Sequence, residues 1–433
     1  MPCPDRADER SNPSSPLYSK LKIALFSYRG NPFCGGQGVY LRHLSRALAG
    51  RGHRVHVFTG PPYPGEMPWA DVHLLPDENF IVRPARYFPA RKMLDPFHLF
   101  EYGLARLGSN PEMLAQSLRL YLLLRRLHRE EPFDVLHDNH SLGYGLLLVQ
   151  RLGLPVVATI HHPLGIDRRE DLRQMQGLLR RARRAIYYPL VMQGVVARRL
   201  DGVITVSDFA GQMVRDYYRL APGEVERVYN GVDGAFFRPR AEIKKVPGRA
   251  IFVGSTEDRK KGVRYLLEAL KVLEPPAHLV IVDGRRYPGR VYAQNLILEL
   301  GLQSRVIWRE QISDEELVQE YNLAEVAVVP SLFEGFGLPA LEAMACGLPV
   351  VATTAGALPE VTGADGEAAL LVPTREPEAL ARAIRRLLAS PALRQRLGEQ
   401  ARRRAERNFS WDQAAAATEA VYLQVRRDRR APY

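Results

Sequence analysis

Cysteine is scarce in this 433-residue chain, and long apolar runs are absent from it. The three cysteines, Cys3, Cys34 and Cys346, lie too far apart in sequence to predict a disulfide framework or a metal-ligand cluster. No apolar run approaches the roughly 18 residues needed to cross a bilayer. Residues 1–20 are rich in proline, serine and charge, so we expect a disordered lead-in, no secretory signal and a cytoplasmic protein.

Positive charge is in excess, because 60 lysines and arginines stand against 48 aspartates and glutamates, for a net charge of +12. Between Arg168 and Leu200, nine arginines and two acids surround the apolar and aromatic stretch Ala185–Met192. Such a segment suits the anionic inner face of a cell membrane, although a solvated helix face has the same composition. No pattern typical of nucleic-acid-binding modules is present, so we do not expect nucleic acid as a partner.

Strands and amphipathic helices alternate from Lys22 onward, which predicts parallel sheets with helices on both faces. A length of 433 residues suits two such domains, and the turn-rich stretch from Asn230 to Gly248 marks their junction. We predict a lead-in over 1–20, an N-terminal domain over 21–235 and a C-terminal domain over 236–409. A final segment over 410–433 should form a helix from Trp411 with Ser410 as its N-cap.

The most informative segment follows the apolar run Val326–Val329, which is typical of a buried parallel strand. After it come a turn with Gly335 and Gly337, and a short helix expected to start at Pro339 and to stop before Gly347. Glycines let the backbone approach a ligand closely, and the free N–H groups at a helix N-terminus attract anions. This turn is therefore a candidate site for a diphosphate.

Two carboxylates flank the same turn, since Glu334 precedes it and Glu342 lies within the helix, eight positions later. A carboxylate can accept hydrogen bonds from a pair of sugar hydroxyls, so these two residues are suited to hold sugars on either side of a diphosphate. The alternative is that both glutamates are solvated residues at a strand-to-helix junction. The spacing alone does not decide between the two interpretations.

The run Glu334-Gly335-Phe336-Gly337-Leu338-Pro339-Ala340-Leu341-Glu342, with its flanking strands, resembles the E-x7-E motif of retaining family-four glycosyltransferases. The resemblance implies the α/β fold called GT-B, in which two Rossmann-like, doubly wound domains face a central cleft. It implies that the C-terminal domain binds a nucleotide-sugar donor, that the N-terminal domain binds the acceptor, and that the last helix crosses back onto the N-terminal domain. It also implies metal-independent transfer, with the nucleotide sugar as co-substrate and no cofactor.

Three cations, Arg259, Lys260 and Lys261, stand just before the helix predicted over Val263–Leu273. Positive charge at a helix N-terminus costs about 0.3–1 kcal/mol per residue, and a bound anion reverses that sign. The resemblance assigns the diphosphate contact to Lys261, with Arg259 and Lys260 as weaker candidates. Where the family usually has an arginine after the preceding strand, this sequence has Ser255, so that contact is either missing or supplied by Arg259.

Residues of the N-terminal domain complete the predicted site. Gly36 and Gln37 belong to a glycine-rich turn after the first strand, where backbone N–H groups can reach a phosphate or the reacting sugar, and a plain tight turn is an equal interpretation. His161 follows the predicted strand Pro155–Ile160, at the edge of the sheet where ligands of such folds bind. The resemblance places a histidine near the donor sugar at this position, with His162 as the second candidate.

These residues predict retaining transfer of a hexose from a nucleoside diphosphate sugar to a hydroxyl of a saccharide or lipid-linked acceptor. UDP-hexose is the favoured donor and GDP-mannose the second. The predicted catalytic residues are His161, Glu334 and Lys261, and the predicted donor-binding residues are Glu342, Gly335, Phe336, Gly337, Leu338, Lys260, Arg259, Ser255, Gly36 and Gln37. A sugar-nucleotide epimerase or hydrolase with the same pocket, and a non-catalytic peripheral membrane protein, remain as alternatives.

Overall fold

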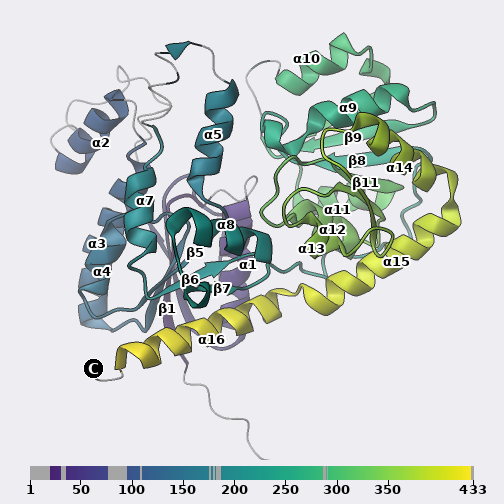
Figure 1. The fold of residues 1–433 in the computed structure, drawn as a ribbon. Coiled ribbons are helices and arrows are strands. Elements are labelled where there is room, and N and C mark those ends of the chain that lie inside the picture. The colour runs from purple at the N-terminus through teal and green to yellow at the C-terminus, as the bar shows by residue number, and fades with distance from the viewer. Residues whose placement is uncertain are drawn as a thin grey trace, which may run out of the picture.

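The computed structural model describes residues 20–30, 36–76, 95–107, 110–174, 177–178, 181, 187–285, 289 and 291–430. The predicted lead-in up to residue 19, the cysteines Cys3 and Cys34, and parts of the basic segment 168–200 lie outside the described residues. The described chain forms two lobes that lie side by side, with the C-terminal helices running beneath both (Figure 1). No helix among the described residues is both long enough and apolar enough to cross a membrane.

The N-terminal lobe is built on a seven-stranded sheet in which all neighbouring strands pair in parallel. Its strands are β1 (Lys22–Ser27), β2 (Arg54–Thr59), β3 (Asp71–Leu74), β4 (Val135–Asn139), β5 (Val156–Thr159), β6 (Gly202–Thr205) and β7 (Val225–Arg227). The order is β3-β2-β1-β4-β5-β6-β7, so the chain winds outward from β1 to β3 and then returns to wind out from β4.

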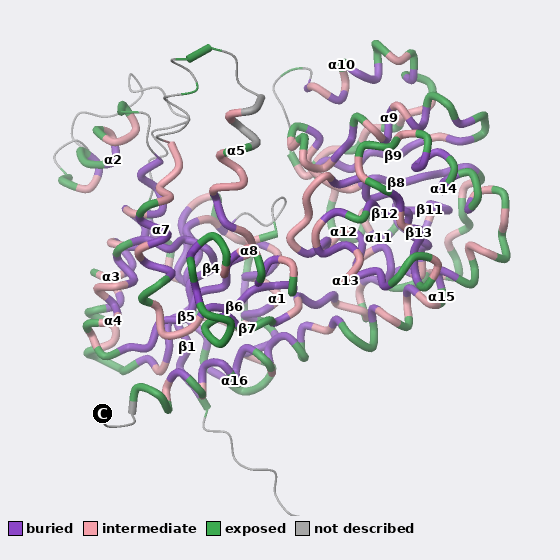
Figure 2. Tube along the Cα trace, viewed as in Figure 1, coloured by how far each residue is buried: buried purple, intermediate pink, exposed green. Residues whose placement is uncertain are grey.

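Helices cover both faces of this sheet, and the inner strands are buried (Figure 2). One face packs against α1 (Gly36–Gly50) and α16 (Trp411–Arg430), and the other against α3 (Glu112–Glu130), α4 (Gly145–Gln150), α7 (Leu190–Ala197) and α8 (Asp208–Tyr218). Two further helices, α2 (Pro96–Arg106) and α5 (Leu164–Gln174), lie above the carboxyl edge of the sheet (Figure 1).

The C-terminal lobe repeats the design with a six-stranded parallel sheet in the order β10-β9-β8-β11-β12-β13. Its strands are β8 (Arg249–Val253), β9 (His278–Asp283), β10 (Val306–Glu310), β11 (Val326–Val329), β12 (Val350–Thr353) and β13 (Ala369–Val372). On one face lie α9 (Val263–Val272), α10 (Tyr292–Glu299) and α14 (Pro377–Ala389), and on the other α11 (Asp314–Leu323), α12 (Leu338–Ala345), α13 (Leu358–Thr362) and α15 (Pro391–Asn408).

Side-chain alternation along the strands explains why both faces need helices. Ile251 of β8 belongs to the core beneath α12, whereas its neighbours Ala250 and Phe252 belong to the core beneath α9. Successive strand residues point to opposite faces, and here both sets are apolar, so the sheet is stable only when it is covered twice. The two lobes therefore confirm the predicted pair of doubly wound, Rossmann-like domains.

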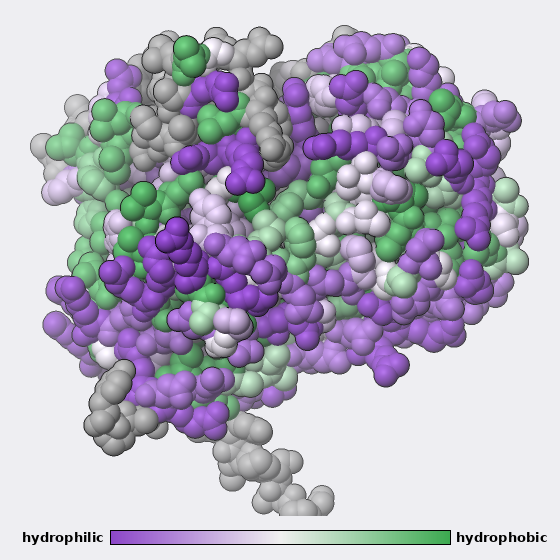
Figure 3. All heavy atoms as spheres, viewed as in Figure 1, coloured by the Kyte–Doolittle hydropathy of each residue, from purple (hydrophilic) through white to green (hydrophobic). Residues whose placement is uncertain are grey.

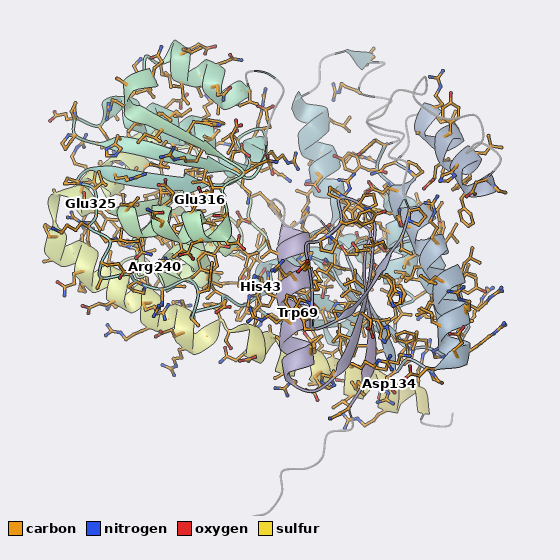
Figure 4. The ribbon with its side chains drawn as sticks, turned by 180° about the vertical axis from the view of Figure 1, so that it is seen from behind. His43, Trp69, Asp134, Arg240, Glu316 and Glu325 are labelled. Carbon is orange, nitrogen blue, oxygen red and sulfur yellow. The ribbon has the colours of Figure 1, made fainter. Side chains whose placement is uncertain are left out.

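The final helix α16 leaves the C-terminal lobe and packs on the N-terminal one, against α1 and β6. Ser410 accepts a hydrogen bond from the Gln413 N–H (3.1 Å), as predicted for the N-cap. Near the other end of the helix, Arg426 donates to Asp134 (2.5 Å), which lies beside α16 in Figure 4. The middle of α16 is tied to the sheet by Tyr422, whose hydroxyl lies 2.5 Å from the buried His137 ring.

Each sheet has one point where consecutive crossovers run in opposite directions, between β1 and β4 in the first lobe and between β8 and β11 in the second. Loops diverge at such switch points, and the crevice outside the carboxyl ends of the strands is where open α/β sheets bind ligands. The predicted site residues lie in the segments after β1, β8 and β11, apart from His161, which follows β5. The fold therefore positions these residues at the two sheet edges that border the cleft.

Candidate functional site

The loops after β8 and β11 are held against each other. The Leu332 N–H donates to the Lys260 carbonyl (2.6 Å), and Gly262, at φ +70°, lies so close to the Pro330 carbonyl that any side chain there would overlap it. Only glycine adopts this conformation readily, which explains why it ends the turn Arg259–Lys261 before α9. The two loops thus form one rigid unit from which Lys261 and Glu334 project.

Lys261 and Glu334 are in direct contact, since the Lys261 Nζ donates to the Glu334 Oε2 over 2.7 Å. Ser331 donates its hydroxyl to the same oxygen (3.2 Å). Both partners stay open to the solvent, with 25% of the lysine side chain and 12% of the glutamate side chain exposed. A cation and a carboxylate that are joined yet accessible can each exchange this contact for a diphosphate oxygen and a sugar hydroxyl.

The backbone of Glu334 is fixed by the loop after β12. Its carbonyl accepts a hydrogen bond from the Ala357 N–H (3.0 Å). Gly356, at φ +59°, lies against the same carbonyl with no room for a Cβ atom. A side chain at Gly356 would therefore displace Glu334.

The turn that follows Glu334 enters α12 through Gly337, which has φ +108° and serves as the N-cap residue. The helix begins at Leu338, one residue before the predicted start at Pro339, because proline fits the second helical position as well as the first. A Cβ at Gly337 would lie 2.9 Å from the Leu358 side chain. Phe336, by contrast, is buried and packs in the core beneath α12, so its side chain supports the turn and does not face the cleft.

Glu342 sits on α12 with Tyr321 of α11 as its partner, whose hydroxyl donates to the Glu342 Oε2 (3.0 Å). Burial raises the pKa of Glu342 to about 8, and the tyrosine hydrogen bond only partly offsets this. The second carboxylate is therefore separate from the Lys261–Glu334 pair and has a partner of its own on α11. Tyr321 was not predicted from the sequence.

His161 of the N-terminal lobe reaches the Glu334 turn through its backbone, because a Cβ built on Gly335 would lie 3.0 Å from the His161 carbonyl. Its Nε2 lies 2.8 Å from the Asn139 Oδ1. The Asn139 amide nitrogen donates to the Gln37 carbonyl (2.9 Å), and this hydrogen bond fixes the orientation of the Asn139 side chain. The Asn139 Oδ1 therefore faces His161 and accepts a hydrogen bond from its Nε2–H. Burial lowers the pKa of His161 to about 3, so the ring is neutral and its Nδ1 is left as an acceptor.

Gly36 and Gln37, predicted in a glycine-rich turn, are instead the first residues of α1, and a Cβ on Gly36 would lie 3.8 Å from the Leu338 side chain. Gln37 contributes its carbonyl to the Asn139 amide, as described above. The structure thus brings the predicted residues His161, Gly335 and Leu338 together with Gly36 and Gln37 across the two lobes.

Lys260 is directed to a different partner from Lys261. Its ammonium pairs with Asp167 of α5, and the other oxygen of that carboxylate accepts from His162 (2.9 Å). Burial opposes ionisation of Asp167, but His162 and Lys260 outweigh it and hold the pKa of that carboxyl below its usual value. Asp167 and Lys260 thus form a contact between the lobes, which His162 supports, and the sequence did not predict Asp167 as a partner of either residue.

A second contact between the lobes closes behind the Glu334 turn. Ser207, the N-cap of α8, donates its hydroxyl to the Gly335 carbonyl (2.7 Å). The Glu360 carboxylate of α13 accepts from the Asp208 and Phe209 N–H groups at the start of α8, each at 2.8 Å. The Ser-Asp pair before an amphipathic stretch is a recognisable helix start, but nothing in the local sequence points to Glu360 as its partner.

Two other predicted donor residues, Arg259 and Ser255, belong to the same segment after β8 as Lys261. The Arg259 guanidinium stacks over the Tyr292 ring, 4.8 Å from its centroid. Ser255 is half-buried in the loop directly after β8, at the start of the segment that leads to Arg259. Figure 3 shows hydrophilic side chains on both lobes, on either side of their junction, on the face in view.

The chain matches two family profiles in succession, Glycosyltransferase Family 4 over residues 34–236 and Glycosyl transferases group 1 over residues 235–404. It is 40% identical to an MMP α-(1→4)-mannosyltransferase from Mycolicibacterium hassiacum, over 93% of this chain and 98% of that protein. A glycogen synthase from Mycobacterium tuberculosis is 29% identical over 95% of this chain and 97% of its own length. Sucrose-phosphate synthase from Thermosynechococcus elongatus has a similar structure, with a TM-score of 0.73, 26% identity and coverage of 94% of this chain and 99% of that one. The chain therefore belongs to the family-four glycosyltransferases and has their GT-B fold.

Proposed function

We propose that this glycosyltransferase moves a hexose from a nucleoside diphosphate sugar to an acceptor hydroxyl, with retention of the anomeric configuration. The observation that supports the proposal best is the accessible Lys261–Glu334 pair at the N-terminus of α12, with the His161 carbonyl against Gly335. A cation, a helix N-terminus and a neutral histidine meet there from two lobes. This arrangement suits a diphosphate that leaves and a sugar that is held.

In the proposed reaction, the bond between the anomeric carbon and the diphosphate oxygen breaks, and its electron pair leaves with the diphosphate. Lys261 and the backbone N–H groups at the start of α12 stabilise the charge that develops on the leaving group. The acceptor hydroxyl attacks from the face that the diphosphate vacates, and its proton passes to an oxygen of the leaving diphosphate. No carboxylate of the chain acts as a nucleophile in this scheme.

The remaining residues position the donor. Glu334 accepts hydrogen bonds from hydroxyls of the transferred hexose, and Glu342 accepts them from the ribose. His161 orients the hexose through its carbonyl and its free Nδ1. Transfer needs no metal ion in this proposal, so activity should be the same with and without a chelator.

The identity of the hexose and the base is tested by a thermal-shift screen of UDP-glucose, UDP-galactose and GDP-mannose. UDP-hexose is the first candidate, and GDP-mannose belongs in the screen because the relative at 40% identity is named a mannosyltransferase. The acceptor in the proposal is a saccharide, free or lipid-linked. NMR assignment of the product's anomeric configuration then tests retention, and an inverted product contradicts the proposal. The proposal is also contradicted if the donor, incubated without an acceptor, yields free or isomerised sugar.

The proposal includes contact with an anionic membrane surface on the cytoplasmic side. Support comes from the described part of the basic segment, where Leu178 is 87% exposed, Val191 is 79% exposed and Arg181 is exposed as well. Apolar side chains flanked by arginines suit the boundary between lipid headgroups and acyl chains. The protein should cosediment with phosphatidylglycerol vesicles but not with phosphatidylcholine vesicles. If it stays in the supernatant with both kinds of vesicle, this part of the proposal is contradicted.

A further inference from the structure

A cavity of about 400 Å³ lies beside the proposed donor site, between α5 of the N-terminal lobe and the start of α9 in the C-terminal lobe. Ile166 of α5 lines the cavity on the side of the N-terminal lobe. Four cations line it, namely Arg259, Lys260, Arg264 and Arg375, and the described part of the lining includes no acidic residue. A pocket of this size can enclose a ligand as large as a phosphorylated hexose.

Two of the four cations have carboxylate partners. Lys260 pairs with Asp167, and Arg264 pairs with Glu268 one helical turn along α9 (2.7 Å). Among the residues that the structure describes, Arg259 and Arg375 have no ion-pair partner, and Arg259 is held only by its stacking on Tyr292. Two guanidinium groups that face one cavity without a carboxylate provide planar donors for a phosphate or a carboxylate.

Aromatic side chains form the rest of the lining. Tyr265 and Tyr292 stand on the C-terminal side, and Phe333 comes from the loop after β11 that also carries Glu334. Apolar and aromatic walls with a few charged groups are the usual makeup of a small-molecule site, and ring faces suit the C–H edges of a sugar. The lining thus favours an organic anion over a bare inorganic ion.

The cavity is distinct from the proposed donor site, although the two share a wall. Neither Lys261 nor Glu334 lines it, because the turn Arg259–Lys261 directs Lys261 to Glu334 and Arg259 to Tyr292. The walls come from both lobes, as they do around the hexose position. A ligand seated here would lie at the cleft next to a bound donor.

We propose that this cavity binds the phosphate or carboxylate group of an anionic saccharide acceptor, with Arg259 and Arg375 as its ligands. The inference rests on the proposed function, because it assigns a chemical class to the acceptor of that reaction. It also changes one sequence prediction, since Arg259 becomes a contact of the acceptor and not of the donor diphosphate.

Isothermal titration calorimetry on the full chain tests the proposal with glucose 6-phosphate, glucuronate, glucose and inorganic phosphate as probes. Glucose 6-phosphate or glucuronate should bind, glucose should not, and inorganic phosphate should bind more weakly than the sugar anion. Arg375→Gln should weaken binding of the sugar anion by about tenfold or more, the loss expected for one charged hydrogen-bond donor. Arg382→Gln, an exposed arginine on the neighbouring helix α14, is the matched control and should change nothing.

A separate titration with the nucleotide sugar distinguishes failure of this inference from failure of the proposed function. Saturating nucleotide sugar should leave the affinity for the sugar anion intact, and Arg375→Gln should leave donor affinity intact. The inference is overturned if neither sugar anion binds better than glucose, if inorganic phosphate binds equally well, or if donor and sugar anion compete. Donor binding that persists in those cases leaves the proposed function standing, whereas absence of donor binding contradicts the proposed function itself.

Discussion

The buried carboxyl of Glu342 should make donor affinity depend on pH. Desolvation raises its pKa to about 8, although Tyr321 donates a hydrogen bond to it. The ribose offers two hydroxyl donors, which the ionised carboxylate accepts and the protonated carboxyl accepts less well. With a pKa of about 8, about a tenth of the free molecules carry the ionised form at pH 7. The apparent Kd for the donor at pH 7 should therefore be about tenfold above its value at high pH, and it should fall as the pH rises through 8.

Calorimetry of nucleotide-sugar binding between pH 6 and 9 measures this dependence. The nucleotide sugar is preferable to the free nucleotide, because its diphosphate has no proton to lose in this range. Parallel titrations at pH 7 in two buffers of different ionisation enthalpy should show release of about 0.9 proton per donor bound. Glu342→Gln should bind the donor more weakly and with little dependence on pH. A wild-type Kd that stays constant from pH 6 to 9, with no proton released, would refute the ribose role of Glu342.

Three further substitutions test the geometry of the site. Lys261→Ala should lower kcat by about 10²–10³-fold in steady-state assays, as expected for loss of one electrostatic stabiliser. Lys271→Ala, at the exposed end of the following helix α9, should leave kcat unchanged. An unchanged kcat in Lys261→Ala contradicts the role of Lys261. Gly356→Ala should abolish the donor-induced thermal shift, because its Cβ has no room beside the Glu334 carbonyl. Gly366→Ala is the control, since Gly366 also has a positive φ but lies in open space. This control should only destabilise the fold, by about 1–2 kcal/mol. Ser207→Ala should lower the free energy of unfolding in urea by about 0.5–2 kcal/mol through loss of the α8 cap, and a smaller loss would mean that solvent replaces that cap.

Much of the candidate site follows from local sequence. The apolar run before Glu334, the glycines after it and Pro339 together specify a strand, a turn and a helix, because each residue acts on its own segment of backbone. The cations before α9 are recognisable in the same way. Since both segments follow strands of one parallel sheet, their approach at the sheet edge was also predictable, and the 2.7 Å contact between Lys261 and Glu334 agrees with it.

The contacts between the lobes were not predictable. Asp167, Ser207 and Glu360 are ordinary helix-start residues in the sequence, and their partners lie 93, 128 and about 150 positions away. Pairings over such separations depend on how two separately folded lobes come to face each other. The same limit applies to Arg259, which the family resemblance offered as a weaker candidate for the diphosphate contact and whose guanidinium stacks on Tyr292 in the structure.

The sequence by itself determined the two doubly wound sheets, the turn after Glu334 and the family. These features follow from properties of short segments, namely hydrophobic periodicity, the positions of glycine and proline, and the flanking glutamates. Only the tertiary structure decided that Lys260 pairs with Asp167 and Arg259 stacks on Tyr292, that Glu342 is buried beside Tyr321, and that a basic cavity lies next to the site. The physical reason is that side-chain direction, burial and charge pairing depend on neighbours from distant segments, and those neighbours are set by how the lobes pack.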